Sequence, residues 1–196
     1  MNASMLPTGP FGCLLADPPW AFGTYSNRTG TTPHRGKDDH YSVMSFDQLA
    51  ALPVGSVAAK DYALFMWVVD SHLDAALRLG EAWGFRFKTC AFVWFKSRNE
   101  GVVPKISMGY WTRKQTEQCW LFTRGRPPRL SKGIRQAIFC ERGLHSAKPD
   151  EQYERIEALV AGPYLELFAR LSRPGWTAWG DQSGSRDTLF GKEAVA

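Results

Sequence analysis

Short runs of apolar residues recur along the chain, and most are bounded by glycine, proline or charged residues. Runs of this length are typical of buried strands, because a strand covered on both faces needs apolar side chains at nearly every position. The pattern predicts strands at residues 11–16, 63–69, 87–95, 117–123, 137–140, 164–170 and 177–179.

Helical patterns lie between several of these runs. Ser45 and Gln48 have the spacing of a capping box, which predicts a short helix that continues to Leu52. Ser71 is of a residue type that caps helices, so a second helix is expected to follow it. Its apolar face would consist of Leu73, Ala76, Leu77 and Trp83.

A third helix is predicted over residues 150–161, preceded by Pro149 and ended near Gly162. Strands that alternate with helices favour an α/β fold with a mostly parallel sheet. No internal repeat or linker interrupts the pattern, and 196 residues is a usual length for one domain. We therefore predict a single domain with its core at about 11–182.

Residues 23–40 follow the first predicted strand and are rich in Gly, Thr, Ser, Asn and charged residues. Such a composition cannot form a packed core, so we predict a long flexible loop that could clamp a substrate. The loop holds His34 and His40, but no third ligand has a suitable spacing, so no metal site is predicted. The polar residues 183–196 are expected to fray.

Positive charge is concentrated in the middle of the chain. Residues 88–148 hold 13 Lys and Arg against 3 Asp and Glu, whereas residues 1–87 hold 6 against 8 and residues 149–196 hold 5 against 8. The formal net charge of +5 therefore conceals a strongly basic block between two mildly acidic ones. This distribution favours binding of a polyanion such as nucleic acid, although a solvated basic face without a partner would have the same composition.

The four cysteines lie singly within apolar runs and lack the spacing of a zinc site or a disulfide framework; they are Cys13, Cys90, Cys119 and Cys140. They are typical of reduced core cysteines in an intracellular protein. The start of the chain lacks the features of a signal peptide, and no apolar run reaches transmembrane length. We therefore expect a cytoplasmic protein without a membrane contact.

The first predicted strand runs directly into Asp17, Pro18, Pro19 and Trp20. Open α/β sheets bind ligands at the carboxyl ends of their strands, which is where this tetrapeptide is expected. Its residues suit methylation of an exocyclic amino group on a flat base. Asp17 can accept one amino hydrogen, the carbonyl of Pro18 or Pro19 can accept the other, and the indole of Trp20 offers a stacking face.

An aromatic amine is a poor nucleophile, because its lone pair is delocalised into the ring. Two acceptors on its hydrogens favour the pyramidal form, in which the lone pair points at an incoming methyl group. An ordinary turn after a strand also uses Asp and Pro, so the tetrapeptide by itself leaves both interpretations open.

Five further blocks follow Leu15-Ala16-Asp17-Pro18-Pro19-Trp20. They are Phe65-Met66-Trp67-Val68, Val93-Trp94-Phe95-Lys96, His145-Ser146-Ala147-Lys148-Pro149-Asp150-Glu151, Glu166-Leu167-Phe168-Ala169-Arg170 and Trp179-Gly180-Asp181-Gln182. Together they resemble, in order, the motifs of the MT-A-type family of S-adenosylmethionine-dependent adenine methyltransferases. That family includes the catalytic subunit of the eukaryotic messenger-RNA adenine methyltransferase and many bacterial and phage DNA enzymes. The resemblance implies a Rossmann-like class I methyltransferase fold with helices on both faces of the sheet and a circularly permuted motif order.

The resemblance also implies how the methyl donor S-adenosylmethionine is held. Lys148 would pair with the methionine carboxylate, and Asp17 would lie near the amino group of the donor as well as the target amine. Such a zwitterion needs one cation and one anion. Glu166 and Arg170 are expected on one side of a strand by alternation. The residues implied at the donor are Asp17, Lys148, Glu166, Phe168, Arg170, Asp181 and Gln182, with Gln182, Arg170 and Asp181 at the ribose and Phe168 beside the adenosine.

The sequence departs from the eukaryotic members of this family in three ways. Asp181 stands where those enzymes have Asn, and the segment 171–175 is shorter and lacks a His found there. Only ten residues precede Phe11, so the segment that contacts the donor's adenine is expected to be absent or replaced. The residues of that adenine pocket are therefore not predicted.

The resemblance and the basic block together predict methylation of the 6-amino group of adenine in DNA, in a bacterium, phage or mobile element. The compact chain favours DNA over RNA as the acceptor. A base inside a duplex would have to flip out to reach Asp17, at a cost of a few kcal/mol. The residues expected to contact nucleic acid are Lys96, Arg98, Lys105, Tyr110, Trp111, Arg113 and Lys114.

The sequence leaves three other functions open: an RNA adenine methyltransferase of the same family, a catalytically silent nucleic-acid-binding subunit, and an enzyme that methylates a small molecule. Silent subunits of the family usually lose the catalytic acid, so the presence of Asp17 and Lys148 favours an active enzyme. The basic block would lack a purpose on a small-molecule enzyme. A homodimer, or a heterodimer with a related subunit, is compatible with the resemblance.

Overall fold

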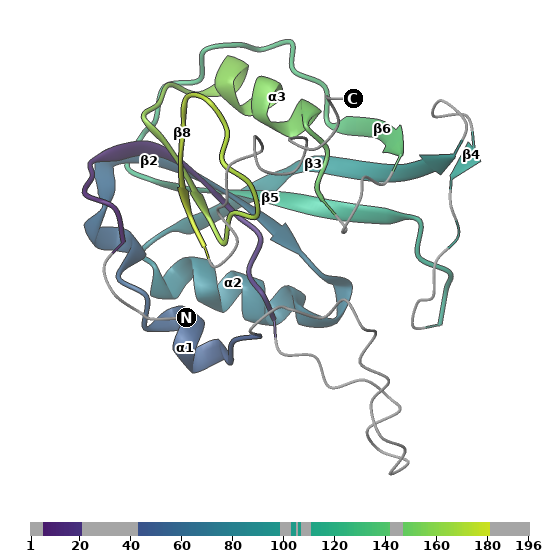
Figure 1. Ribbon diagram of the computed structural model, residues 1–196, viewed down its shortest axis with the longest axis horizontal. Coiled ribbons are helices and arrows are strands. Elements are labelled where there is room, and N and C mark those ends of the chain that lie inside the picture. The colour runs from purple at the N-terminus through teal and green to yellow at the C-terminus, as the bar shows by residue number, and fades with distance from the viewer. Residues whose placement is uncertain are drawn as a thin grey trace, which may run out of the picture.

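One twisted sheet organises the chain in the computed structural model (Figure 1), which describes residues 6–20, 43–98, 103–104, 106, 111–141 and 147–180. The predicted loop at 23–40 and the predicted tail at 183–196 lie outside these residues. All seven predicted strands are present. The strands are β1 (Phe11–Ala16), β2 (Ala58–Val68), β3 (Arg86–Arg98), β4 (Val103–Pro104), β5 (Thr116–Arg124), β6 (Ala137–Glu141), β7 (Tyr164–Leu167) and β8 (Trp176–Trp179).

The strand order is β4-β3-β5-β2-β1-β7-β8, and β6 pairs with the other edge of β3. β1 is parallel to β2 and β7, β8 is parallel to β7, and β6 is parallel to β3. Only β5 and β4 run antiparallel to their neighbours. Six of the eight described strands therefore point the same way, which confirms a mostly parallel sheet. Because β5 runs in the opposite direction, its amino end lies at the end of the sheet where β1 and β2 have their carboxyl ends.

Three α-helices and two 3-10 turns are described: α1 (Phe46–Ala50), η2 (Val54–Ser56), η3 (Asp70–His72), α2 (Leu73–Ala82) and α3 (Glu151–Leu159). The predicted capping box is confirmed at α1, where the Ser45 hydroxyl accepts the Gln48 backbone N–H at 3.2 Å and the Gln48 side chain accepts the Ser45 N–H at 2.8 Å. None of the described helices is long and apolar enough to cross a membrane.

The helices cover both faces of the sheet (Figure 1). Successive strand residues face opposite sides, so neighbours in β1 and β2 enter different layers. Leu14 and Leu64 pack with the α1 and α2 side chains Leu49 and Leu79, whereas Leu15 and Phe65 pack with Ile156 of α3. Burial of each such side chain contributes roughly 2 kcal/mol, so the two layers hold the strand ends firmly in place.

The start of α2 differs from the prediction. The turn η3 occupies Asp70–His72, so His72 is the N-cap and no side chain caps the helix. The Ser71 hydroxyl instead hydrogen-bonds the His72 ring at 2.8 Å. The predicted face is also shifted, since Leu77 is 37% exposed. The buried face of α2 includes Gly80, which packs so closely on Phe122 that a Cβ there would lie 2.4 Å from the ring.

The end of β7 also differs from the prediction. The strand stops at Leu167, and Phe168 has a φ of 63°, the left-handed conformation that ends extended structure in a non-glycine residue. Glu166 and Arg170 therefore do not share one side of a strand by alternation. The turn after Leu167 sets the position of Arg170 instead.

Candidate active site

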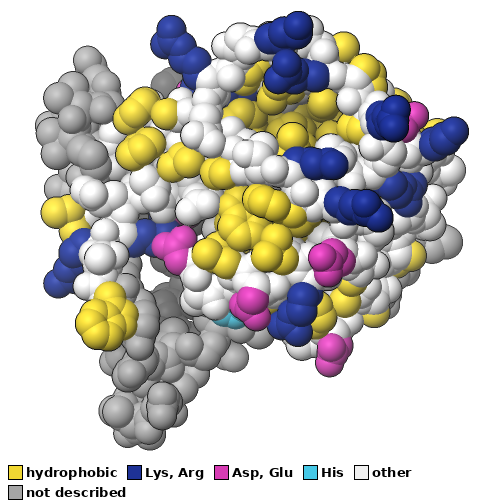
Figure 2. All heavy atoms as spheres, turned by 180° about the vertical axis from the view of Figure 1, so that it is seen from behind, with side chains coloured by type: hydrophobic (Ala, Val, Ile, Leu, Met, Phe, Trp, Pro, Cys, Tyr) yellow, Lys and Arg dark blue, Asp and Glu magenta, His cyan; other side chains and the backbone are white. Residues whose placement is uncertain are grey.

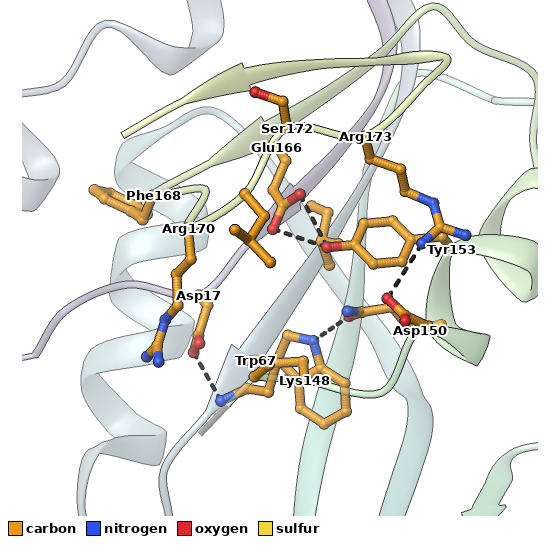
Figure 3. A pocket seen from close by; sticks show the side chains of 14 residues that line it. Asp17, Trp67, Lys148, Asp150, Tyr153, Glu166, Phe168, Arg170, Ser172 and Arg173 are labelled. Atoms are coloured by element: carbon orange, nitrogen blue, oxygen red, sulfur yellow. Dashed lines mark hydrogen bonds and ion pairs between the residues drawn. The ribbon is translucent and has the colours of Figure 1, made fainter. Parts of the chain in front are cut away.

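A pocket opens at the edge of the sheet where β1 and β7 end (Figure 3). Its walls come from β1, β2, α3 with the segment before it, and β7 with the turn that follows it. Five residues predicted to bind the methyl donor line it: Asp17, Lys148, Glu166, Phe168 and Arg170. The other two, Asp181 and Gln182, lie outside the described residues.

Four charged side chains form a line of alternating sign beside this pocket. The Lys148 Nζ lies 3.0 Å from Asp17 Oδ1 and 3.1 Å from Glu117 Oε2. Glu117 also forms an ion pair with Lys96 through Oε1. The four side chains are only 13% to 28% exposed, so each is largely removed from water. We call this line, Asp17, Lys148, Glu117 and Lys96, the ion network.

Two tryptophans support the ammonium groups of the ion network. Lys148 Nζ lies 5.3 Å from the ring centroid of Trp67, and Lys96 Nζ lies 5.3 Å from that of Trp94. Both rings are buried, and their N–H groups are bonded: Trp67 donates to Gln152 Oε1 at 2.6 Å and Trp94 donates to the Cys140 carbonyl at 3.0 Å. A desolvated cation over an indole face is stabilised by the ring quadrupole, so these contacts hold both lysines in the network.

The ion network shifts the pKa values of its members. Burial alone would raise the pKa of Glu117, but Lys148 and Lys96 outweigh it and hold that pKa at about 2. Burial would lower the pKa of Lys148, but Asp17 and Glu117 outweigh it and raise that pKa. Glu117 and Lys148 are therefore both charged across the whole neutral range.

Glu117 was not predicted from the sequence as a site residue. It reaches the site because β5 is antiparallel, which brings the start of this strand to the edge where β1 ends. In the sheet it pairs with Trp94, two residues before Lys96. The local signal in the sequence was an acidic residue at the start of an apolar strand. Whether such a residue reaches the site depends on the direction of the strand, which that signal does not give.

The prolines after Asp17 form a tight turn. The Pro18 carbonyl accepts the Trp20 N–H at 2.9 Å, and the Pro19 carbonyl accepts the Met44 N–H at 2.8 Å. Each carbonyl oxygen has two lone pairs, so one acceptor site remains on each. The ion pair with Lys148 uses Oδ1 of Asp17, and Oδ2 lies outside that pair.

Trp20 lies in the core instead of on an open surface. It is 5% exposed, its ring lies 5.7 Å from that of His72, and it forms a bridge with Met44. Among the described residues, its buried indole N–H has no hydrogen-bond partner. The predicted stacking face is therefore covered, because the turn directs the ring beneath the strand end.

Glu166 and Tyr153 meet on the wall of the pocket opposite Lys148 (Figure 3). The Tyr153 hydroxyl lies 3.1 Å from Oε1 and 3.0 Å from Oε2 of Glu166 and donates to this carboxyl group. Arg173 covers the Tyr153 ring at 4.3 Å and pairs with Asp150 at 3.2 Å. Tyr153 and Arg173 were not predicted as site residues, since neither lies in a position that the motifs mark as functional.

The residues predicted to contact nucleic acid are only partly described. Trp111 is 93% exposed and Arg113 is exposed, just before β5 begins. Lys114 pairs with Asp70 at 3.2 Å, and Lys96 belongs to the ion network. Lys105, Tyr110 and the side chain of Arg98 lie outside what the structure describes.

The basic block is divided between two ends of the sheet. Residues 111–114 precede β5 at the end where Asp17 lies, whereas 125–135 follow β5 at the opposite end. There the Arg124 guanidinium donates to the carbonyls of Gly55, Ala58 and Ala59 and is not available to a phosphate. Figure 2 shows that Lys and Arg side chains gather around a hydrophobic hollow on one face of the molecule. The basic residues that precede β5 and those that follow it therefore lie at opposite ends of that strand.

A family model described as MT-A70 matches residues 11–182, nearly the whole chain. The chain belongs to the MT-A70 family. Members of this family are S-adenosylmethionine-dependent adenine methyltransferases with the class I methyltransferase fold, as the sequence motifs and the sheet also indicate.

The relatives of this MT-A70 chain are bacterial and eukaryotic. It is 34% identical over 190 residues to the type II methyltransferase M.MunI of Mycoplasma sp, covering 89% of this chain and 78% of that protein. It is 28% identical over 182 residues to an N(6)-adenosine-methyltransferase MT-A70-like protein of Arabidopsis thaliana, covering 89% of this chain and 24% of that protein. It is 27% identical over 183 residues to the human N(6)-adenosine-methyltransferase catalytic subunit METTL3, covering 89% of this chain and 28% of that protein.

Proposed function

We propose that this MT-A70 protein transfers a methyl group from S-adenosylmethionine to the exocyclic 6-amino group of adenine in DNA. The observation that carries the proposal is the pair formed by Asp17 and Lys148, 3.0 Å apart at the pocket directly after β1. An acid that is held by a buried cation at the end of a central strand is fixed in direction. Fixed acceptors stabilise a transition state without having to reorganise during the reaction.

Asp17 and one proline carbonyl bind the two hydrogens of the adenine amine. Oδ2 of Asp17 lies outside the ion pair with Lys148, and the Pro18 and Pro19 carbonyls each keep one acceptor site. Together these acceptors hold the amine in its pyramidal form and turn its lone pair toward the pocket. The acceptors orient the amine and do not need to deprotonate it first, because the amine loses a proton readily once methylated.

The chemistry of the pocket fits the methyl donor. A cation and an anion lie side by side, as the zwitterionic amino-acid end of the donor requires, so Lys148 would hold its carboxylate and Asp17 its amino group. Phe168, 8% exposed, would border the adenosine. Arg170, Asp181 and Gln182 would hydrogen-bond the ribose. When bound, S-adenosylmethionine supplies an electrophilic methyl group.

The nucleic acid would approach from the end of the sheet where Asp17 lies. Arg113 is exposed there, and Lys114 is held next to β2 by Asp70. Trp111 is 93% exposed at this end, whereas the ring of Trp20 is buried. Stacking of a base on an exposed indole contributes about 1–3 kcal/mol, which would offset part of the cost of base flipping.

The relatives favour DNA as the acceptor. The match to the bacterial type II methyltransferase has the higher identity and covers 78% of that protein, whereas the match to METTL3 covers 28%. METTL3, an N(6)-adenosine-methyltransferase catalytic subunit, keeps RNA as the second candidate acceptor.

The test is incubation of the full chain with isotopically labelled S-adenosylmethionine and separate pools of DNA and RNA, followed by mass spectrometry of the nucleosides. Labelled N6-methyladenine in the DNA pool is the expected result. Label in the RNA pool alone would show that the acceptor is RNA and not DNA, while the proposed methyl transfer would stand. No label in either pool, with the donor bound, would favour the silent subunit.

A further inference from the structure

Three acids line the pocket, Asp17, Asp150 and Glu166, and among the described residues only Glu166 lacks a cation as an ion-pair partner. Its carboxyl group is held by the neutral Tyr153 hydroxyl at 3.1 Å and 3.0 Å. Among the described residues it forms no ion pair, in contrast to Asp17 at 3.0 Å from Lys148. Figure 3 shows both acids directed into the same pocket from neighbouring strands, β1 and β7.

The charged groups around Glu166 come from each element that packs against the pocket. Asp17 follows β1, Lys148 and Asp150 precede α3, and Arg170 and Arg173 follow β7. Of the two arginines, Arg173 is committed to Asp150 at 3.2 Å. Asp17 disfavours the negative charge of ionised Glu166, and the two arginines favour that charge without forming an ion pair with it.

These surroundings change the ionisation of Glu166. Burial raises its pKa to about 7, and Asp17 acts in the same direction, whereas the Tyr153 hydrogen bond, Arg173 and Arg170 oppose the shift. Near neutral pH the group is therefore present both as carboxylic acid and as carboxylate. A hydroxyl suits this state, because it can donate to the carboxylate and accept from the acid.

We propose that Glu166, positioned by Tyr153, recognises the positive charge of the methyl donor and releases a proton to solvent when the donor binds. The inference rests on the proposed function, because it needs S-adenosylmethionine in this pocket. A cation near a buried acid favours the ionised form. The proton passes from the carboxyl oxygen to the buffer, and no covalent bond of the donor changes.

The consequence is discrimination between donor and product. S-adenosylmethionine carries a sulfonium charge, whereas S-adenosylhomocysteine has an uncharged thioether at the same place. Ionised Glu166 attracts the sulfonium of the donor, whereas it has little electrostatic interaction with the thioether of the product. The preference for the donor should therefore increase as the pH rises through 7, which would help to expel the product at the end of each cycle.

The test is isothermal titration calorimetry of the full chain with each of the two compounds, in buffers of different ionisation enthalpy, at pH 6, 7 and 8. For wild type, we expect donor binding at pH 7 to release about 0.4 proton if the donor lowers the Glu166 pKa by one unit. The donor affinity should then rise about fivefold from pH 6 to pH 8. Binding of the product should release fewer protons, and the affinity for the product should change less between pH 6 and pH 8.

Two variants test the roles of the partners. Glu166→Gln keeps the size of the side chain and should abolish the excess proton release and the pH-dependent preference for the donor. Tyr153→Phe removes one donor that favours the carboxylate, so the proton release should move to higher pH. The matched control is Tyr164→Phe, which loses a hydroxyl bonded to the Val160 carbonyl at 2.9 Å and packs on the same Trp176, outside the pocket.

The outcomes separate this inference from the proposed function. If wild type binds donor and product with equal proton release, or if Glu166→Gln leaves the difference intact, the inference is wrong and the methyltransferase proposal stands. If wild type binds neither compound, the proposed function fails and the inference fails with it. A shift in Tyr164→Phe equal to that in Tyr153→Phe would overturn the role of Tyr153. Thermal unfolding of each variant checks that it is folded.

Discussion

Glu117 and Glu166 lie at the same edge of the sheet, are both largely buried and are both hydrogen-bonded, yet their pKa values move in opposite directions. Burial raises the pKa of each, but two lysine ammonium groups hold the pKa of Glu117 at about 2. Among the described residues, Glu166 has only the neutral Tyr153 hydroxyl within hydrogen-bond distance, and its pKa rises to about 7. Burial therefore does not decide the charge of an acid in this site. The presence of a cation at contact distance does.

The contrast also separates two tasks. The ion network is rigid, because each of its inner members has two partners of opposite sign. Such a network suits the fixed orientation of Asp17. The pair formed by Glu166 and Tyr153 can change its charge, which suits a group that responds to a charged ligand.

The largest expected effect follows replacement of the acid that ends the ion network. Asp17→Asn keeps the shape but loses the charge that pairs with Lys148, and methyl transfer should fall about 10³-fold or more. Donor binding should remain detectable by calorimetry, because Lys148 and the turn after β7 are intact. The control is Asp61→Asn at the opposite end of the sheet, where the side-chain oxygen accepts the Arg126 N–H at 2.7 Å and Asn can still accept. Equal losses in both variants would contradict the catalytic assignment.

The next effect is on stability. Glu117→Gln leaves two buried ammonium groups without their shared acid, so the free energy of unfolding at pH 7 should fall by about 3 kcal/mol. Glu166→Gln removes a group that is already about half protonated, so its cost should stay below about 1 kcal/mol. Urea denaturation of both variants against wild type measures the difference. Similar losses would mean that the two acids have similar surroundings.

The pH dependence of stability should divide between the same two acids. The folded-state pKa of Glu117 is depressed to about 2, so its contribution is present above the ordinary value of 4.5 and is lost as the pH falls toward 2. The folded-state pKa of Glu166 is raised to about 7, so its contribution is present below 4.5 and is lost as the pH rises through 7. Unfolding curves from pH 3 to pH 8 should lose the acid-side slope in Glu117→Gln and the neutral-side slope in Glu166→Gln. A neutral-side slope that persists in Glu166→Gln would exclude this acid as its source.

The sequence was sufficient for elements whose signals are local. Buried strands appear as apolar runs, and the capping box of Ser45 and Gln48 needs only four residues. The expectation that Asp17 and Lys148 lie near one another came from the order of family motifs, and their ion pair agrees with it. Nothing in the composition or periodicity of residues 17 and 148 would have brought them together.

Other features depend on contacts that no local pattern carries. Glu117 joins the ion network only because β5 runs against its neighbours. Trp20 is covered because the turn after Asp17 pairs it with Met44. Tyr153 reaches Glu166 through the position of α3 over the sheet, which requires both elements to be placed. Strand direction and helix placement are tertiary quantities, so these residues could be interpreted only after folding.

The smallest effect tests the division of the basic block, which is also a consequence of the direction of β5. Arg113 precedes β5 at the end where Asp17 lies, and Arg129 follows it at the opposite end; both are exposed. If DNA lies across the first end, Arg113→Glu should weaken binding and reduce the slope of log affinity against log salt by about 1, the loss of one phosphate contact. Arg129→Glu makes the same change in net charge and should leave the slope nearly unchanged, because long-range attraction is screened beyond about 10 Å at 0.1 M salt. Fluorescence anisotropy of a labelled duplex at several salt concentrations gives both slopes. A larger change in Arg129→Glu would move the DNA-binding surface to the opposite end, where no strand of the parallel set presents its carboxyl end and Asp17 could not reach the bound adenine.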